Sequence, residues 1–269
     1  MYTKIARKSL HPLLIACLLV GLGLISASAQ AEVQATGAVI VVDSTDDEWN
    51  INGVCTLREA IDNASFNSHM GGNTDCAAGS GDDTITFDPS LAGQTITFDL
   101  YGQPFFTFGN LTITGPDEGI TIQGNDREGI FGIGDTYKTV VISNLIITGG
   151  KNEPSIEVKS STTLLTLNNC TIAHNADSAG VSGGYLKINN CTIADNDGGG
   201  INNDGVLMLT NSTVSGNRGG AINSGDGSGG DTATIINSTI SGNTASSGGA
   251  INGNSAAISI INSTIYSNM

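Results

Sequence analysis

The sequence predicts an all-β protein, a right-handed parallel β-helix with one short helix capping its N-terminal end. Three observations lead to this prediction. Apolar residues return at fixed distances from a repeated Asn, at intervals of 21 to 26 residues. Within each interval they alternate with period two, which indicates strands rather than helices. A helix-capping signature also occurs near the N-terminus of a chain that otherwise has a strand-like pattern.

The repeat is clearest where Asn is followed by Ser or Cys and then Thr. Apolar residues occupy the positions four and two residues before this Asn and three residues after it. Asn adopts the left-handed conformation that a sharp bend needs, and Gly pairs mark a later corner. Each unit is therefore a strand, an Asn bend, a second strand, a glycine corner and a third strand, and successive units stack as coils. The same template also fits Asn144, and it fits Asn110 with Phe106, Phe108 and Ile113.

Two columns of Asn are expected along the stacked coils. Side chains at the same position of neighbouring coils lie about one strand spacing apart, roughly 4.8 Å, and can form a hydrogen-bonded ladder. The outward Thr two residues after the bend completes a glycosylation-like triplet, which the repeat already explains. The bend column comprises Asn144, Asn169, Asn190, Asn211, Asn237 and Asn262, and the column six residues later comprises Asn175, Asn196, Asn217, Asn243 and Asn268.

Two cysteines share one position of the repeat. Cys170 and Cys191 each follow a bend Asn in neighbouring coils, so their Cα atoms are expected roughly 5 Å apart, within reach of a disulfide. A buried pair of reduced thiols is the open alternative. Cys55 and Cys76 then form the natural second pair, which would close a loop at the N-terminal end.

The first 31 residues have the pattern of a secretory signal peptide. Basic residues precede an apolar run over 13–25 and small residues follow it, which is typical of export. Cys17 lies in a lipoprotein-like box, but the apolar run continues beyond it, so lipidation is disfavoured. We therefore divide the chain into a signal over 1–31, an N-terminal cap over 32–100 and coils over 101–269, with an incomplete last coil.

The charge of the mature chain excludes several classes of partner. Three of ten basic residues lie in the signal, which leaves 7 − 25 = −18. A surface this acidic repels nucleic acids and anionic membranes. We expect no membrane span, because no second apolar run of sufficient length follows the signal.

The single predicted helix lies in the sequence CTLREAI at Cys55–Ile61. Thr56 and Glu59 form a capping box, and the helix is expected to cover the open first coil. Together with DDTITF at Asp82–Phe87, GQTITF at Gly93–Phe98 and NLTITGP at Asn110–Pro116, this segment resembles the CSLREA family of secreted bacterial β-helix proteins. Thr56 stands where the family name has Ser. The GGAI units also resemble repeats of polymorphic outer-membrane proteins. These resemblances imply architecture and a cell-surface location, and no settled activity.

Candidate catalytic residues are sparse. His174 and Asp195 share the position five residues after the bend, and a polysaccharide lyase or hydrolase would use such a pair, although exposed turn residues are the favoured interpretation. Acidic segments at Asp43–Glu48 and Gly79–Asp83 are candidates for calcium, but their spacing matches no regular ligand set.

Three functions remain open from the sequence. The first is a structural or adhesive module that binds a polysaccharide or another cell-surface ligand. The second is a carbohydrate-active enzyme, and the third is an ice-binding face built from the outward Thr column. The chain stops seven residues after Asn262, so we expect the C-terminal end either to continue in a longer protein or to self-associate through exposed strand edges.

Overall fold

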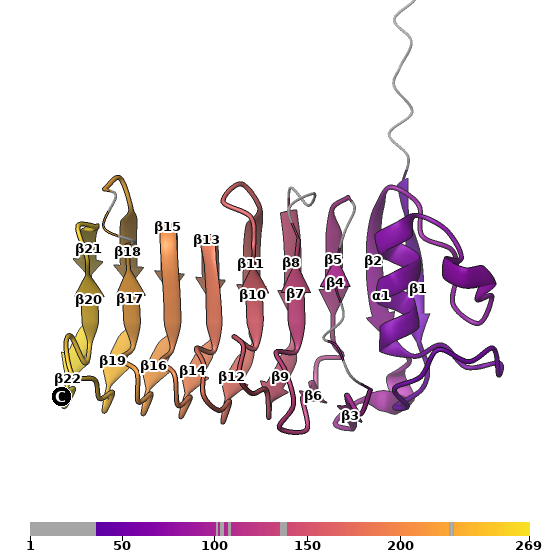
Figure 1. Ribbon diagram of the computed structural model, residues 1–269, viewed down its shortest axis with the longest axis horizontal. Coiled ribbons are helices and arrows are strands. Elements are labelled where there is room, and N and C mark those ends of the chain that lie inside the picture. The colour runs from indigo at the N-terminus through magenta and orange to yellow at the C-terminus, as the bar shows by residue number, and fades with distance from the viewer. Residues whose placement is uncertain are drawn as a thin grey trace, which may run out of the picture. The chain divides into compact units, whose positions relative to one another are not determined.

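The computed structural model describes residues 36–100, 102, 105–106, 109–134, 139–225, 227 and 229–269. The predicted signal segment, including Cys17, lies outside these residues. Residues 35–269 belong to one compact unit, a solenoid of stacked coils with the α-helix α1 (Leu57–Phe66) at its N-terminal end (Figure 1).

Each coil contributes strands to three stacks, and the pairings between named strands are parallel. The first stack contains β1 (Thr36–Val42), β2 (Asp82–Phe87), β5 (Leu111–Thr114), β8 (Thr139–Ser143), β11 (Leu164–Asn168), β18 (Thr232–Ile236) and β21 (Ala257–Ile261). The second, an eight-stranded sheet, contains β3 (Thr95–Thr97), β6 (Ile120–Gln123), β9 (Leu145–Thr148), β12 (Thr171–Ala173), β14 (Thr192–Ala194), β16 (Thr213–Ser215), β19 (Thr239–Ser241) and β22 (Thr264–Tyr266). The third contains β4 (Phe105–Phe106), β7 (Phe131–Ile133), β10 (Ile156–Val158), β17 (Ile222–Ser224) and β20 (Ile251–Gly253).

Two long strands join the first and third stacks. β13 (Val181–Asn189) and β15 (Ile201–Thr210) pair with third-stack strands through their first halves and with first-stack strands through their second halves. The two stacks thereby form one 14-stranded sheet. The parallel β-solenoid with one N-terminal helix is therefore confirmed.

The register follows the predicted period. Leu165 pairs with Leu186, Leu186 with Leu207, and Leu207 with Ala233, so the offsets are 21, 21 and 26 residues. These side chains are buried, as are the partners two residues later and the apolar residues after the bend. The inward assignment of the apolar columns is therefore confirmed for these coils.

The last coil differs in burial. Ile258, Ile260 and Ile265 continue the inward columns but are 36%, 45% and 40% exposed. Their counterparts one coil earlier, Ala233, Ile235 and Ile240, are fully buried. Apolar side chains that lie inside the preceding coils are thus open at β21 and β22.

The backbone turns sharply at every Asn of the bend column. Asn144, Asn169, Asn190, Asn211, Asn237 and Asn262 all have φ between 50° and 59°, the left-handed region that Asn tolerates. Amide–amide hydrogen bonds join Asn169 to Asn144 and Asn237 to Asn211, at 3.2 and 3.3 Å. This column is largely exposed, so its main contribution is the backbone conformation.

The column six residues after the bend forms a continuous buried ladder. Nδ2 of each Asn donates to Oδ1 of the Asn in the next coil at 2.8–2.9 Å, from Asn175 to Asn268. The same Oδ1 atoms also accept a backbone N–H of the preceding coil. Buried polar groups require hydrogen-bond partners. This ladder supplies them to the side-chain amides and to the backbone N–H groups at the corner that follows the eight-stranded sheet.

Cys170 and Cys191 are free and buried, so the structure has the reduced pair rather than a disulfide. They belong to a ladder with serines of later coils, in which each backbone N–H contacts the sulfur or hydroxyl of the next coil. The hydrogen bond to Cys170 and burial raise the pKa of the Cys191 thiol. Cys55 and Cys76 are joined by a disulfide, with Cα atoms 4.8 Å apart.

The repeat template fails at Asn110. Ile113 pairs with Ile142, so it lies before a bend and not after one. Gly115 takes the bend position, because its N–H bonds to Ser143 as the N–H of Asn144 bonds to Asn168. Phe106 lies in the third stack opposite Ile133, and Phe108 lies outside the described residues. The bend of this coil is therefore at Gly115, at the start of the loop over 115–119, and the apolar positions assigned around Asn110 belong to other strands than the template predicted.

Helix α1 covers the first coil. It begins with the predicted capping box, in which Thr56 and Glu59 each bind the other's backbone N–H. Leu57, Ala60 and Ile61 are fully buried, and the helix lies against β1, β2 and β4. The 3₁₀ turns η1 (Met70–Gly72) and η2 (Pro89–Leu91) complete this end of the chain. β2 and β3 lie within the predicted cap segment but already pair with the solenoid.

Candidate functional site

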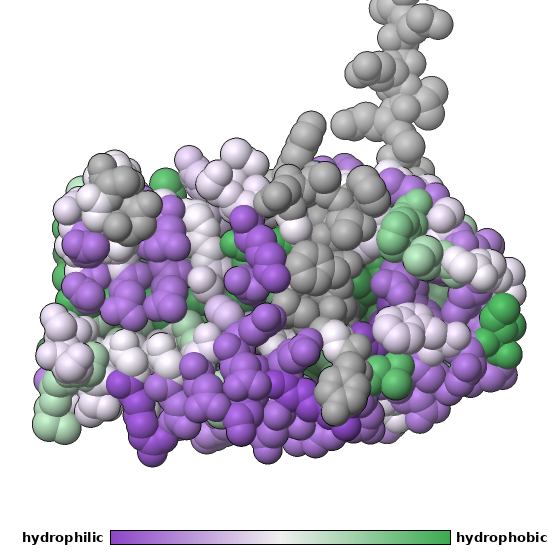
Figure 2. All heavy atoms as spheres, viewed as in Figure 1, coloured by the Kyte–Doolittle hydropathy of each residue, from purple (hydrophilic) through white to green (hydrophobic). Residues whose placement is uncertain are grey.

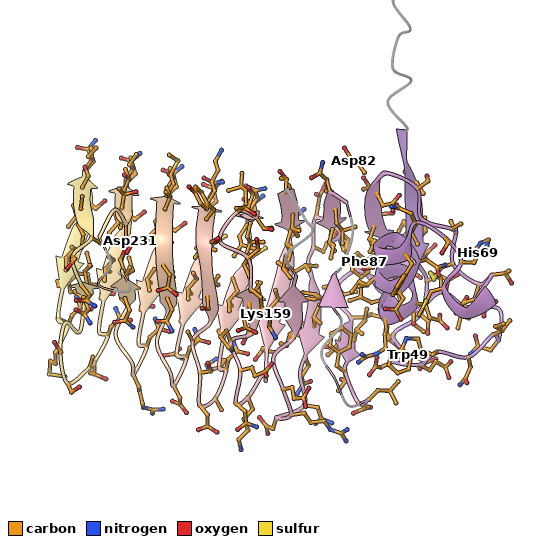
Figure 3. The ribbon with its side chains drawn as sticks, turned by 45° about the horizontal axis from the view of Figure 1, so that its top comes forward. Trp49, His69, Asp82, Phe87, Lys159 and Asp231 are labelled. Carbon is orange, nitrogen blue, oxygen red and sulfur yellow. A yellow bond between two sulfur atoms is a disulfide. The ribbon has the colours of Figure 1, made fainter. Side chains whose placement is uncertain are left out.

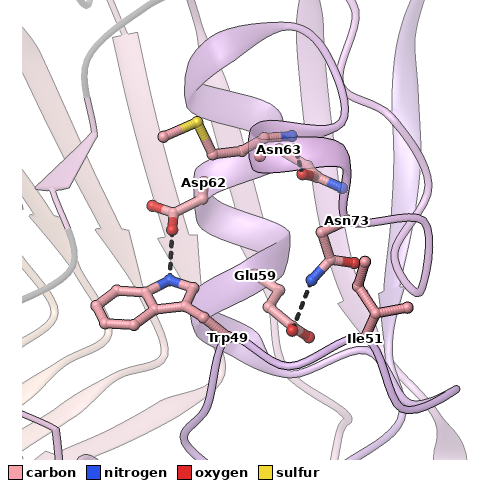
Figure 4. Close-up of a pocket in the computed structure, with 8 residues that line it drawn as sticks. Trp49, Ile51, Glu59, Asp62, Asn63 and Asn73 are labelled. Carbon is pink, nitrogen blue, oxygen red and sulfur yellow. Dashed lines mark hydrogen bonds between the residues drawn. The ribbon is translucent and has the colours of Figure 1, made fainter.

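A pocket of about 350 Å³ lies on the outer side of helix α1. Trp49 and Ile51 come from the loop before the helix, Glu59 and Asp62 from the helix itself, and Met70 from η1. Asn63, Gly71 and Asn73 complete the lining. Figure 4 shows Trp49 and Asp62 on one side, Ile51 and Asn73 on the other, and Glu59 between them. The cap, rather than the repeat, forms this concave site.

Hydrogen bonds fix the polar groups of this cap pocket. Trp49 Nε1 donates to Oδ2 of Asp62 at 2.6 Å. Asn73 Nδ2 donates to Oε1 of Glu59 at 2.6 Å, and the backbone N–H of Thr56 donates to Oε2 at 3.0 Å. Both carboxylate oxygens of Glu59 therefore accept hydrogen bonds within the fold, whereas Asp62 accepts one through Oδ2, from the Trp49 indole.

Burial raises the pKa of both carboxyl groups. For Glu59 burial outweighs its hydrogen bonds from Thr56 and Asn73. For Asp62 burial outweighs the opposing effects of Trp49 and of the Arg58 charge. Carboxyl groups with raised pKa values in a concave site are candidates for a functional role.

A buried ion pair between Arg58 and Asp47 lies next to the Trp49 ring that lines the pocket. Arg58 and Asp47 have side chains 2% and 1% exposed and bind each other through two guanidinium nitrogens. The guanidinium also donates to the carbonyl of Gly102 at 2.9 Å. It lies 4.9 Å from the Trp49 ring centre and 5.0 Å from that of Phe98. This arrangement holds Trp49 in place and joins the helix to the first coil.

A second candidate surface is the outer face of the eight-stranded sheet. Residues at one position of every strand are in direct register along its length. We call this the threonine row: Thr95, Thr121, Thr171, Thr192, Thr213, Thr239 and Thr264, with Ile146 between the second and third. The residues two positions later are mixed, from Thr97 through Ala194 to Tyr266. Figure 2 shows hydrophilic residues gathered along the side where these strands and their corners lie.

A shallower hollow of about 220 Å³ lies beside the threonine row. Asp117 and Glu118 come from the displaced loop, and Asn144 and Asn169 are bend residues. Both carboxyl groups are on exposed residues. The hollow is polar and open, and it adjoins the second stack.

His174 and Asp195 lie on neighbouring coils at a second left-handed position, with φ of 57° and 54°. Both residues are exposed. A Cβ placed on Gly216 would meet Oδ1 of Asp195 at 2.2 Å, so this carboxylate leans toward the following coil and away from His174. Both residues lie at corners of the solenoid, and the described residues contain no hydrogen bond between them.

The acidic segments bind their own chain. Oδ1 of Asp43 accepts the N–H of Cys55, Glu48 accepts from Asn50 and Asn52, and Asp83 accepts from Ala38 and Ser80. Within the described part of the chain there is no cluster of three or more His, Cys, Asp or Glu that would hold a metal. The carboxylates proposed as calcium ligands therefore accept hydrogen bonds from other groups of the chain, and in the described residues they do not gather into a metal-binding cluster.

Sequence reasoning missed the cap pocket. Trp49 and Ile51 lie in a segment without periodicity, and Met70 lies in a turn. Figure 3 shows Trp49 and His69 at the cap end, away from the regular rows of the coils. The available signal was the one tryptophan of the chain close to a helix that carries Arg58, Glu59 and Asp62.

The comparisons with known proteins agree with this architecture. The family model of the right handed beta helix region matches residues 98–265, more than half of the 269-residue chain. The chain therefore belongs to the right-handed β-helix family. The searches of curated proteins and of solved structures found no match. Among the described helices, none combines the length and the apolar character that crossing a membrane requires.

Proposed function

We propose that this protein is a secreted or cell-surface β-helix that binds an extended neutral polysaccharide along its eight-stranded sheet. The observation that carries the proposal is the threonine row, which from Thr171 to Thr264 repeats one methyl and one hydroxyl per coil in direct register. A polymer with a repeating unit gains one weak contact per coil, and such contacts sum along a solenoid.

The chemistry of the row suits a neutral sugar polymer. A Thr hydroxyl donates and accepts hydrogen bonds, and its methyl group packs against apolar ring edges. The net charge of −15, or −18 without the signal segment, disfavours anionic polymers.

Several observations support an extracellular location. The Cys55–Cys76 disulfide is typical of oxidising compartments. The first 31 residues have the composition of a secretory signal. The resemblance of the cap to the CSLREA family points the same way, toward display at a bacterial surface.

A sedimentation assay with insoluble polysaccharides tests the binding proposal. The mature chain is mixed with cellulose, chitin, mannan and xylan, with and without calcium. We expect retention on at least one polymer and loss of retention when Thr192 and Thr213 are both changed to Asp. The matched control changes Thr166 and Thr234 to Asp, which are half-buried outward residues of the first stack. Equal retention of both double variants, or no retention of the wild-type chain, would contradict the proposal.

The same samples separate the two other functions. Release of reducing sugar that depends on His174 or Asp195 would indicate a carbohydrate-active enzyme. Inhibition of ice growth without polysaccharide binding would indicate an ice-binding face, for which the mixed column beside the threonine row is less regular than a double Thr array.

A further inference from the structure

The cap pocket combines apolar walls with an acidic interior. Trp49, Ile51 and Met70 are 54%, 65% and 42% exposed, although each is a large apolar side chain. Glu59 and Asp62 lie three residues apart on α1, so they face the same side of the helix. Exposed apolar groups around the buried Glu59 and the partly buried Asp62 provide two kinds of contact in one cavity of about 350 Å³.

Few polar groups of the pocket remain open to a ligand. Asn63 uses its amide on Met70, Cys76 and Ala77. Asn73 uses its amide on Glu59 and Asp75, and Glu59 has both oxygens bonded. Within the described residues, Oδ1 of Asp62 has no hydrogen-bond partner. A ligand therefore meets one carboxylate oxygen and a largely apolar surface.

The nearby positive charge does not occupy this oxygen. The guanidinium of Arg58 is bound to Asp47 and to the carbonyl of Gly102. Asp75 lies close enough to Glu59 to add negative potential. The Arg58 charge partly offsets the charge of Asp62, but its guanidinium hydrogen bonds go to other groups, and the acidic pocket still favours a cation.

We propose that this pocket binds a lysine side chain of a basic partner protein, with the aliphatic stem between Trp49, Ile51 and Met70 and the ammonium on Oδ1 of Asp62. A lysine stem packs along apolar surface while its charged head reaches a polar group. One free oxygen suits the point charge of an ammonium. A guanidinium prefers two carboxylate oxygens, and Oδ2 of Asp62 is already bound to Trp49.

Two other ligands fit less well. A sugar carries several hydroxyl groups, and the amides that would bind them are already engaged. A second copy of this chain carries the same strong negative charge, so the approach of two copies at the cap is repulsive. Charge complementarity therefore selects a basic protein as the partner.

Trp49 is the only tryptophan of the chain, so its fluorescence reports on this pocket alone. The mature protein is titrated with Nα-acetyl-lysine methylamide, and in parallel with the norleucine and arginine analogues. We expect a saturable change in emission with the lysine probe and binding weaker by about tenfold for norleucine, which lacks the charge-assisted hydrogen bond. Equal binding of norleucine, tighter binding of arginine, or no saturation with the lysine probe would overturn the proposal.

Two variants test the named contacts. Asp62→Asn keeps an acceptor for Trp49 and removes the charge, so it should weaken lysine binding by about tenfold. Ile51→Ala changes an exposed loop residue and should weaken binding severalfold with the helix unchanged. Asp117→Asn, in the polar hollow beside the threonine row, is the matched control and should bind as the wild type does. Wild-type affinity in both Asp62→Asn and Ile51→Ala would overturn the proposal. The pocket and the threonine row are separate surfaces, so this result is independent of polysaccharide binding.

Discussion

Substitution of Asn217 by Ala tests how the buried Asn ladder stabilises the solenoid. The Asn217 side chain is fully buried and makes four hydrogen bonds. Its Oδ1 accepts the N–H and Nδ2 of Asn196, at 3.0 and 2.9 Å. Its Nδ2 donates to the carbonyl of Ile193 at 3.1 Å and to Oδ1 of Asn243 at 2.9 Å. The substitution removes all four bonds at the centre of the ladder.

The cost follows from which partners lose their bonds. Nδ2 of Asn196 still donates to Ile172, and Oδ1 of Asn243 still accepts the N–H of residue 217. The N–H of Asn196 is left buried without an acceptor, and an orphaned group costs about 1–3 kcal/mol beyond the lost bonds. With each net bond worth about 0.5–1.5 kcal/mol, we expect a loss of about 3–5 kcal/mol.

Two variants in the same coil provide the comparison. Asn211→Ala loses an exposed bond to Asn237 and places Ala in a left-handed conformation, which together cost about 1–2 kcal/mol. Thr213→Ala removes an outward side chain and should cost under about 1 kcal/mol.

The assay is urea-induced unfolding followed by circular dichroism, with amide exchange at Asn196 as the local measurement. The free energy of unfolding should fall most in Asn217→Ala, and the Asn196 amide should lose protection there. If Asn217→Ala costs no more than Asn211→Ala, or if the Asn196 amide stays protected, the ladder does not stabilise the coils as argued.

Three further predictions concern the cap and the cysteine pair. Asp47→Ala leaves the charge of Arg58 buried and should lower the free energy of unfolding by about 3–5 kcal/mol; an unchanged melting temperature would contradict this. Cys170→Ser and Cys191→Ser should each change stability by under about 1 kcal/mol, because serines fill the same column, and a thiol reagent should label both cysteines only after unfolding. Burial raises the pKa of Asp83, so the folded state binds this proton more readily than the unfolded state and loses stability as the pH rises. Asp83→Asn should therefore remove this loss of thermal stability as the pH rises above the ordinary carboxyl range, and an unaltered pH profile would refute the assignment.

The sequence predicts the coils well because stacking in register gives each column one environment. Leu165, Leu186 and Leu207 share a burial state, so a single spacing rule covers them. The rule fails where the chain departs from the spacing. The loop over 115–119 shifted the template. Its three apolar positions therefore matched around Asn110 by coincidence, although Ile113 lies in the strand before the next bend.

The cap pocket could not be predicted by such a rule. Arg58 binds Asp47 eleven residues earlier and the carbonyl of Gly102 forty-four residues later, and neither distance is a period of any element. The acidic segment around Asp47 has the composition of a solvated loop. Its buried ion pair follows from the packing of Arg58 between the rings of Trp49 and Phe98, which depends on tertiary structure alone.

The same physics divides the molecule into two kinds of surface. Inside the coils, the Asn, Cys and Ser ladders and the apolar columns must repeat, because each side chain is the partner of the one in the next coil. Function is then confined to outward positions, where a repeated group suits a repeated ligand. The cap breaks the repeat, and its helix and loops leave a cavity with one open carboxylate oxygen at Asp62. A site of this kind suits a single side chain, so the two proposed kinds of recognition, of a polymer and of a protein partner, would use separate places on one chain.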